Sequence, residues 1–119
     1  MVLRNDRGVI VHGKNNWQFD DDIPLNLKRG MKILCRHEIV LDLGPGEYAF
    51  EVGLASVSAR DWSNRTSVSH EDMTSRQFRI CHIADAGSFS IGLAVRNMVP
   101  VLTHHGVANL RGAMKITSS

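Results

Sequence analysis

The fold is decided by the stretch Leu41-Asp42-Leu43-Gly44-Pro45-Gly46-Glu47-Tyr48-Ala49-Phe50-Glu51-Val52-Gly53-Leu54. Its Gly-Pro-Gly segment places the fixed φ of proline between two flexible residues, which is typical of a tight corner. After the corner, apolar side chains recur with a strict period of two, at Tyr48, Phe50, Val52 and Leu54. This period indicates a strand that buries one face. The stretch therefore predicts the end of one strand, a corner and the next strand.

The residues before the corner show the same alternation. With His37 as the one interruption, apolar side chains occupy the odd positions Met31, Ile33, Cys35, Ile39, Leu41 and Leu43. A direct hairpin with a four-residue loop, 44–47, would bring Leu43 opposite Tyr48 and Leu41 opposite Phe50. In the alternative, the chain crosses from one sheet to another at this point. We favour the crossing, because Leu-x-x-Gly-x-Tyr resembles the tyrosine corner of a β-sandwich.

The rest of the chain also favours strands. We expect strands at 9–11, entered from a turn at 6–8, and at 77–83 and 88–95, with a turn at 84–87 between the last two. Residues 17–24 read as a polar loop, and 56–75 as a long polar loop in which 66–69 could form an edge strand. Since no helix of ten residues is predicted, the chain is expected to be a single all-β domain, 1–119, built as an antiparallel sandwich.

The composition is that of an ordinary globular chain. Of 119 residues, 43% are hydrophobic and 22% charged, and the net charge is +2. This charge is too small and too dispersed to indicate a nucleic-acid surface. No apolar run approaches the ~20 residues of a membrane span and no signal-peptide pattern is present, so a cytoplasmic location is expected. Cys35 and Cys81 are then expected to be reduced core residues rather than a disulfide.

Several short motifs resemble functional patterns but lack the neighbouring residues or elements that those functions need. Gly8 to Asn15 matches the phosphate-binding loop G-x-x-x-x-G-K-[S/T] except at its last position, where Asn15 stands, and no helix is predicted to follow it. The adjacent His104 and His105 would point to opposite faces of a strand, which does not suit a shared metal. Residues 20–22 are three aspartates that read as a solvated loop rather than a calcium site. With no catalytic Ser, His and acid arrangement, we predict no enzyme activity, no metal and no cofactor.

The two tryptophans lie in polar surroundings. Such a ring could pack on the apolar C–H face of a pyranose while nearby amides and carboxylates bind its hydroxyls. Alternatively, each tryptophan closes one end of the core. The residues alone favour the second interpretation, because large rings are more often packed than exposed. The candidate sugar contacts are Asn15, Trp17, Gln18, Asp61, Trp62 and Asn64.

Three segments taken together resemble a known family. They are Asn5 to Asn15, Leu41 to Ala55, and Gln77 to Ile80. In order and spacing, over about residues 4–83, they resemble the C-terminal carbohydrate-binding domain of the ATP-binding subunit of O-antigen polysaccharide ABC exporters, the Wzt-type C-terminal domain. The resemblance implies an immunoglobulin-like β-sandwich that binds O-antigen-type polysaccharide, a step of lipopolysaccharide biosynthesis. It also implies a homodimer that meets the membrane transporter subunit at the inner face of the bacterial inner membrane.

The chain departs from this family in two respects. It carries no nucleotide-binding domain, and nothing in it matches the first strands of the pattern. Either the chain is truncated, or neighbouring chains supply the missing edge, or this is a stand-alone relative. The departures leave an alternative open, a β-sandwich assembly or dimerisation module of a polysaccharide-synthesis or export protein with no sugar site of its own. A third interpretation, a small hydrolase or a module appended to a glycosyltransferase, would as an enzyme need a catalytic pair that the sequence does not show.

Overall fold

The computed structural model describes residues 1–19 and 22–117 as two antiparallel sheets with short helical segments. The strands are β1 (Val2–Asn5), β2 (Ile10–Gly13), β3 (Gly46–Ser56), β4 (Phe78–Ile91), β5 (Ala94–Arg96) and β6 (Val99–Val101). The helical segments are α1 (Asn16–Phe19), α2 (Ala59–Ser63), the 3₁₀ helix η1 (Arg65–Ser67) and α3 (His70–Ser75). The predicted β-rich, antiparallel character is confirmed. The sandwich and its immunoglobulin-like topology are not established by these two sheets and stay predictions.

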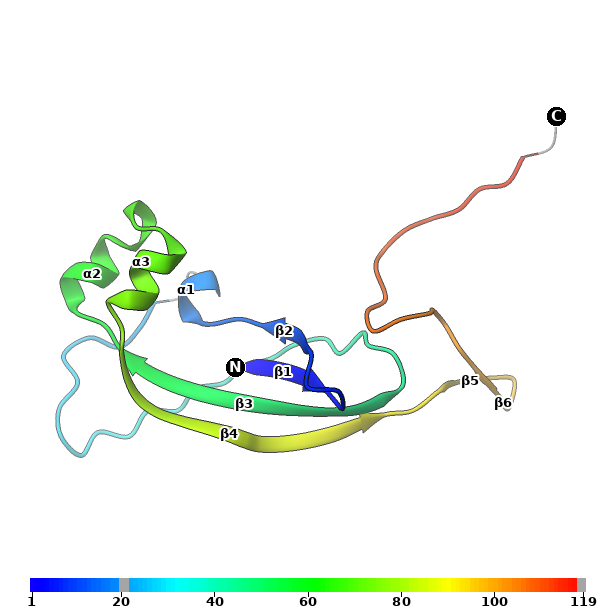
Figure 1. Cartoon of the computed structure of the whole chain (residues 1–119), viewed down its shortest axis with the longest axis horizontal. Coiled ribbons are helices and arrows are strands. Elements are labelled where there is room, and N and C mark those ends of the chain that lie inside the picture. Colours follow the sequence, from blue (N-terminus) through cyan, green and yellow to red (C-terminus); the bar gives the residue numbers. More distant parts are fainter. Residues whose placement is uncertain (20–21, 118–119) are drawn as a thin grey trace.

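The main sheet has the strand order β2-β1-β3-β4, and β5 and β6 form a separate two-stranded sheet. Figure 1 shows β3 and β4 as a long curved ribbon, with α1, α2 and α3 gathered at one end and β5–β6 beyond the other. The predicted turn before β2 is present. Gly8 adopts φ +75°, and the Asn5 side-chain oxygen accepts hydrogen bonds from the backbone N–H groups of Arg7 and Val9. Strand β1, in the centre of the sheet, was not predicted.

A hydrogen bond from Tyr48 holds the corner before β3. The Tyr48 hydroxyl donates to the carbonyl oxygen of Gly44 at 2.6 Å, and the Tyr48 ring stacks on Phe89 of β4 with centroids 5.5 Å apart. Tyr48 is only 5% exposed. A phenol hydroxyl that is buried with its ring needs such a partner, which ties the corner to the first residues of β3.

The strand expected at 31–43 is absent, and the prediction is wrong for the described structure. Residues 31–42 belong to no strand, and Val40 is 94% exposed. Leu43 forms only an isolated bridge with Ala108. The physical reason is competition for a partner, since β1 and β4 occupy both edges of β3. The segment therefore cannot form the hairpin with β3, and it does not cross to a second packed sheet.

The turn expected at 84–87 is also wrong, because β4 runs without interruption from Phe78 to Ile91. The pairing with β3 passes from Phe50↔Gly87 to Val52↔Ile83, so the turn-like residues form a bulge rather than a reversal. A Cβ at position 87 would lie 2.5 Å from the Phe50 ring, which explains why a glycine stands there.

The segment 56–75, expected to be a long polar loop, contains α2, η1 and α3. The edge strand considered at 66–69 is replaced in part by η1. The expected loop at 17–24 begins within α1, and of the three aspartates only Asp22 lies within the described residues. Both cysteines are free and exposed, so the expectation that they are core residues is wrong.

Candidate functional site

The six residues predicted to contact sugar lie on or next to α1, α2 and η1. We call these elements, together with α3, the helical end of the molecule (Figure 1). Two contacts join its helices through α3. The ring of Trp17 in α1 stacks on His70, the first residue of α3, with centroids 5.1 Å apart and an interplanar angle of 12°. Asp61 in α2 pairs with Arg76, the C-cap residue of α3, at 3.0 Å. The two predicted groups, 15–18 and 61–64, are thus each attached to the same short helix.

The residues around Trp17 form a reciprocal cap at the start of α1. The Asn15 N–H donates to the Gln18 side-chain oxygen at 3.0 Å, and the Gln18 N–H donates to the Asn15 side-chain oxygen at 3.1 Å. This is the geometry of a capping box, which satisfies backbone donors that a helix start leaves unpaired. Asn15 and Gln18 are both exposed and Trp17 is half-buried, so an aromatic ring lies beside two amides.

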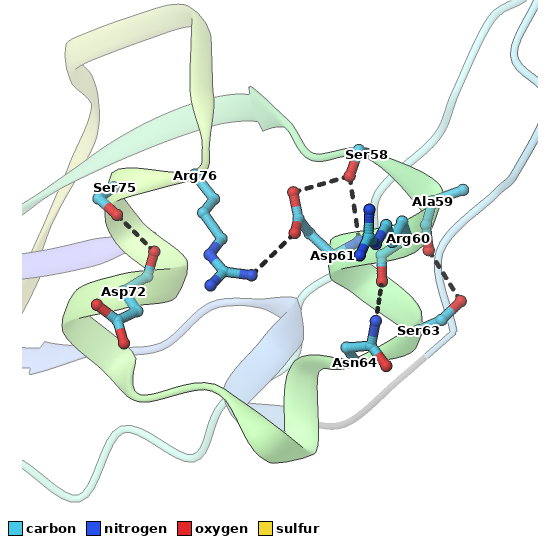
Figure 2. Close-up of polar contacts among 9 residues, drawn as sticks. All are labelled: Ser58, Ala59, Arg60, Asp61, Ser63, Asn64, Asp72, Ser75 and Arg76. Carbon is cyan, nitrogen blue, oxygen red and sulfur yellow. Dashed lines mark hydrogen bonds and ion pairs between the residues drawn. The ribbon is translucent and has the colours of Figure 1, made fainter.

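Asp61 is held by two partners, which Figure 2 shows on either side of its carboxylate. The Ser58 hydroxyl donates to one oxygen at 2.8 Å, and Arg76 donates to the other at 3.0 Å. The hydrogen bond from Ser58 lowers the pKa of Asp61 most, and Arg76 acts in the same direction. The contact of Asp61 with Arg76 links α2 to the end of α3.

Trp62 differs from Trp17 in its exposure. It is 8% exposed and is one of the few buried side chains of the described residues. The Arg65 guanidinium lies over its ring at 4.5 Å and donates to its backbone carbonyl at 3.0 Å. A cation over an indole face is attractive, but it also occupies that face. Trp62 is thus packed as the alternative interpretation of the tryptophans expected, whereas Trp17, whose ring stacks on His70, is only half-buried.

Asn64, the last of the six, is the C-cap residue of α2. Its side-chain amide donates to the Arg60 carbonyl at 3.1 Å (Figure 2), and its backbone N–H donates to the same oxygen at 3.1 Å. Four of the six predicted residues, Asn15, Gln18, Asp61 and Asn64, therefore stabilise helix ends, and an amide or carboxylate in that role can still bind a hydroxyl through its remaining lone pairs or protons.

Sequence reasoning missed the residues that hold this end together, namely Ser58, His70, Arg76 and the second capping serine, Ser69. Their signal was present as the pattern Ser-x-x-Asp, at 58–61 and again at 69–72. In both cases the serine oxygen accepts the N–H of the aspartate three residues later, at 3.1 Å. This pattern before a short run predicts a helix start.

Two shallow hollows lie elsewhere. One, of about 340 Å³, is lined by the turn after β1, the corner before β3, and residues 106–107. The other, of about 200 Å³, is lined by Leu3, Val11, His12, residues 39–43 and Ala108. Neither is lined by a predicted sugar contact. Within the described residues, no three His, Cys, Asp or Glu side chains are grouped so that they could hold a metal ion.

Comparison of this chain with protein-family models, with curated proteins and with solved structures found no match. Among the described residues, no helix has the length and apolar character needed to cross a membrane.

Proposed function

We propose that this chain is a non-catalytic carbohydrate-binding module that recognises O-antigen-type polysaccharide for export by an ABC transporter. One observation carries the proposal. The three segments of the family resemblance, far apart in sequence, fall on neighbouring elements of one sheet. Residues 5–15 span the β1–β2 turn and β2, 41–55 contain the corner and most of β3, and 78–80 begin β4. The buried bond from Tyr48 to Gly44 supports the corner that the pattern implies.

The helical end supplies the chemistry that the proposal needs. Trp17 is the half-exposed ring, and Asn15 and Gln18 are exposed amides within one helical turn of it. A pyranose would place its C–H face against the indole and its hydroxyls on the amides. Trp62, with Arg65 on its ring, keeps α2 in place, and Asp61 and Asn64 border the same end. The immunoglobulin-like sandwich and the homodimer belong to this proposal.

The test is calorimetric titration of the chain with O-antigen polysaccharide. Trp17→Ala is expected to weaken binding by about tenfold or more, because the stacking surface is removed. Phe19→Ala is the matched control, since it removes an exposed aromatic ring from the same helix but outside the predicted contacts. If the wild type and Trp17→Ala bound the polysaccharide with equal affinity, Trp17 would not be a sugar contact. If the folded wild type did not bind it, the proposed function would be wrong.

A second candidate is the assembly module, which one specific observation favours. Strand β4 lies at the edge of the main sheet and runs for 14 residues, the longest strand of the described chain. A long edge strand offers its outer N–H and C=O groups to a strand from another protein. Hydrogen exchange at β4 amides that slows on adding a polysaccharide-synthesis or export protein would support this function. Unchanged exchange with every such protein would speak against it.

A further inference from the structure

The net positive charge of the chain comes from one short segment. Residues 25–36, which we call the basic segment, contain no Asp or Glu and four cations: Lys28, Arg29, Lys32 and Arg36. The remaining residues hold ten Lys and Arg against twelve Asp and Glu. Cations thus occur along the whole chain, but their excess over carboxylates lies in the basic segment. The net charge of +2 results from a segment of +4 and a slightly acidic remainder of −2.

The four cations of the basic segment have no carboxylate partner. Among residues 1–19 and 22–117, none of their side chains forms an ion pair or a hydrogen bond. The backbone of the segment belongs to no strand or helix. Its one ordered feature is a turn, in which the Met31 N–H donates to the Lys28 carbonyl at 3.1 Å and Gly30 adopts φ +85°. The cationic heads are therefore available to a partner outside the chain.

Apolar side chains lie between these cations and face the solvent. The large apolar residues of the segment are all exposed: Leu25, Leu27, Met31, Ile33 and Leu34. Leu34 is 89% exposed. Figure 1 shows the segment as part of a pale-blue loop that extends beyond the end of the β3–β4 ribbon at which the short helices lie. The same stretch of chain therefore presents cations and aliphatic side chains together.

This combination distinguishes between two kinds of large anionic partner. Proteins that bind single-stranded nucleic acid stack the bases on aromatic side chains, and the basic segment contains no aromatic residue. At a bilayer, clusters of about four to eight Lys and Arg are attracted by anionic headgroups. Aliphatic side chains gain free energy when they enter the boundary between the headgroups and the acyl chains. Unpaired cations interspersed with exposed aliphatic residues therefore favour a lipid surface.

We propose that the basic segment is a membrane-surface contact, which lies on a bilayer of anionic lipids with its cations at the headgroups and its apolar side chains in the interface. The acidic remainder of the chain is repelled by the same surface, so the molecule is oriented with this segment toward the bilayer. The contact is with lipid itself. It goes beyond the glycan binding and the transporter contact proposed above, and it rests on neither.

Co-sedimentation of the full chain with vesicles tests the role of charge. We expect binding to phosphatidylcholine vesicles when about a third of the lipid is phosphatidylglycerol, and little binding to phosphatidylcholine alone. Lys28→Gln combined with Arg29→Gln should weaken binding by about 25-fold, at roughly fivefold per cation. Arg96→Gln combined with Arg111→Gln is the matched control, because it changes the net charge equally outside the segment. No binding to the anionic vesicles, or equal losses in the two variants, would overturn the proposal.

The apolar side chains have a matched test of their own. Leu34→Ser should weaken vesicle binding by about fivefold or more, because the most exposed apolar side chain of the segment is lost. Leu110→Ser removes a leucine of similar exposure outside the segment and should leave binding unchanged. Equal affinities of the two variants would contradict insertion of the segment. Binding of the wild type to single-stranded RNA but not to vesicles would replace the lipid surface by a nucleic acid.

The two cysteines allow the contact to be located along the chain. Both are free and exposed, and only Cys35 lies in the basic segment. A polarity-sensitive fluorophore on Cys35, in a Cys81→Ser background, is expected to shift its emission to the blue when anionic vesicles are added. The same fluorophore on Cys81, in a Cys35→Ser background, should show no shift. A shift at neither position, or the same shift at both, would overturn the proposal.

Discussion

At the scale of single residues, glycine and tyrosine have the clearest roles. Tyr48 combines a buried ring with a hydroxyl bonded to the Gly44 carbonyl, so its hydrophobic and polar parts stabilise the same corner. Gly87 has a different role, because it leaves room for the Phe50 ring on the opposing strand. Both were recognisable from sequence only as parts of a pattern. Tyr48 was identified by its spacing from the glycines, whereas Gly87 was wrongly assigned to a turn.

The role of Gly87 can be tested by adding one methyl group. In Gly87→Ala, the new Cβ would lie 2.5 Å from the Phe50 ring, so the ring must move. We expect the free energy of unfolding in urea to fall by about 1–3 kcal/mol, as overpacking does. Gly92→Ala is the control, because a Cβ there has no atom within 4 Å. Equal stability of the two variants would show that Phe50 does not rest against position 87.

Asp61 gives a prediction about pH. Its folded-state pKa lies below its ordinary value, first because of Ser58 and then because of Arg76. Its contribution to stability is therefore present above the ordinary aspartate pKa, and is lost as the pH falls through the folded-state pKa. In an NMR titration of the Asp61 carboxyl, Ser58→Ala and Arg76→Gln should each raise the pKa. An unchanged pKa in either variant would show that the replaced side chain does not stabilise the carboxylate.

At the scale of elements, the short helices depend on their caps. Segments of five and six residues, such as α2 and α3, are too short to be stable by propensity alone. Each begins with a serine whose side chain accepts the N–H three residues later, and each buries one large residue, Trp62 or Met73. Local capping and one anchor per helix thus explain why a polar segment is ordered.

Removing either cap should loosen its own helix. We expect Ser58→Ala and Ser69→Ala each to lower the free energy of unfolding by about 1 kcal/mol, as N-cap losses do. Ser63→Ala is the comparison, because the Ser63 hydroxyl donates to the Ala59 carbonyl within α2 and caps no helix start. Urea unfolding followed by tryptophan fluorescence measures all three. If Ser63→Ala cost as much as the cap variants, the serines would not act as caps.

At the scale of the whole molecule, the chain exposes an unusual amount of apolar surface. Residues 31–42 form no ladder, and many of their apolar side chains are exposed, as is much of the β3–β4 apolar face. A β-rich chain with this surface gains stability when the apolar face is covered.

Limited proteolysis tests the path of the unpaired segment. Trypsin should cleave early after Lys32 and Arg36, since their backbone lies in no strand, and much later after Arg79 in the β3–β4 ladder. Mass spectrometry of the first fragments gives the order. Early cleavage at Arg79, or protection of Arg36, would mean that the segment is paired and β4 is not.

The sequence by itself determined the local features of this protein: the alternation that makes β3 one-sided, the corner before it, the turn before β2, and the strand character of 78–83 and 88–91. The capping serines Ser58 and Ser69 also mark the starts of α2 and α3, which the predicted loop at 56–75 did not include. The six candidate sugar contacts lie at one end of the molecule because α1, α2 and η1 lie there, and their binding role stays a prediction.

The tertiary structure alone decided which segments pair. Residues 31–43 alternate nearly as regularly as β3, with His37 as the one interruption, but β1 and β4 occupy both edges of β3. A period of two specifies which side chains share a face, whereas a ladder also needs a free edge, and that depends on competition between distant segments.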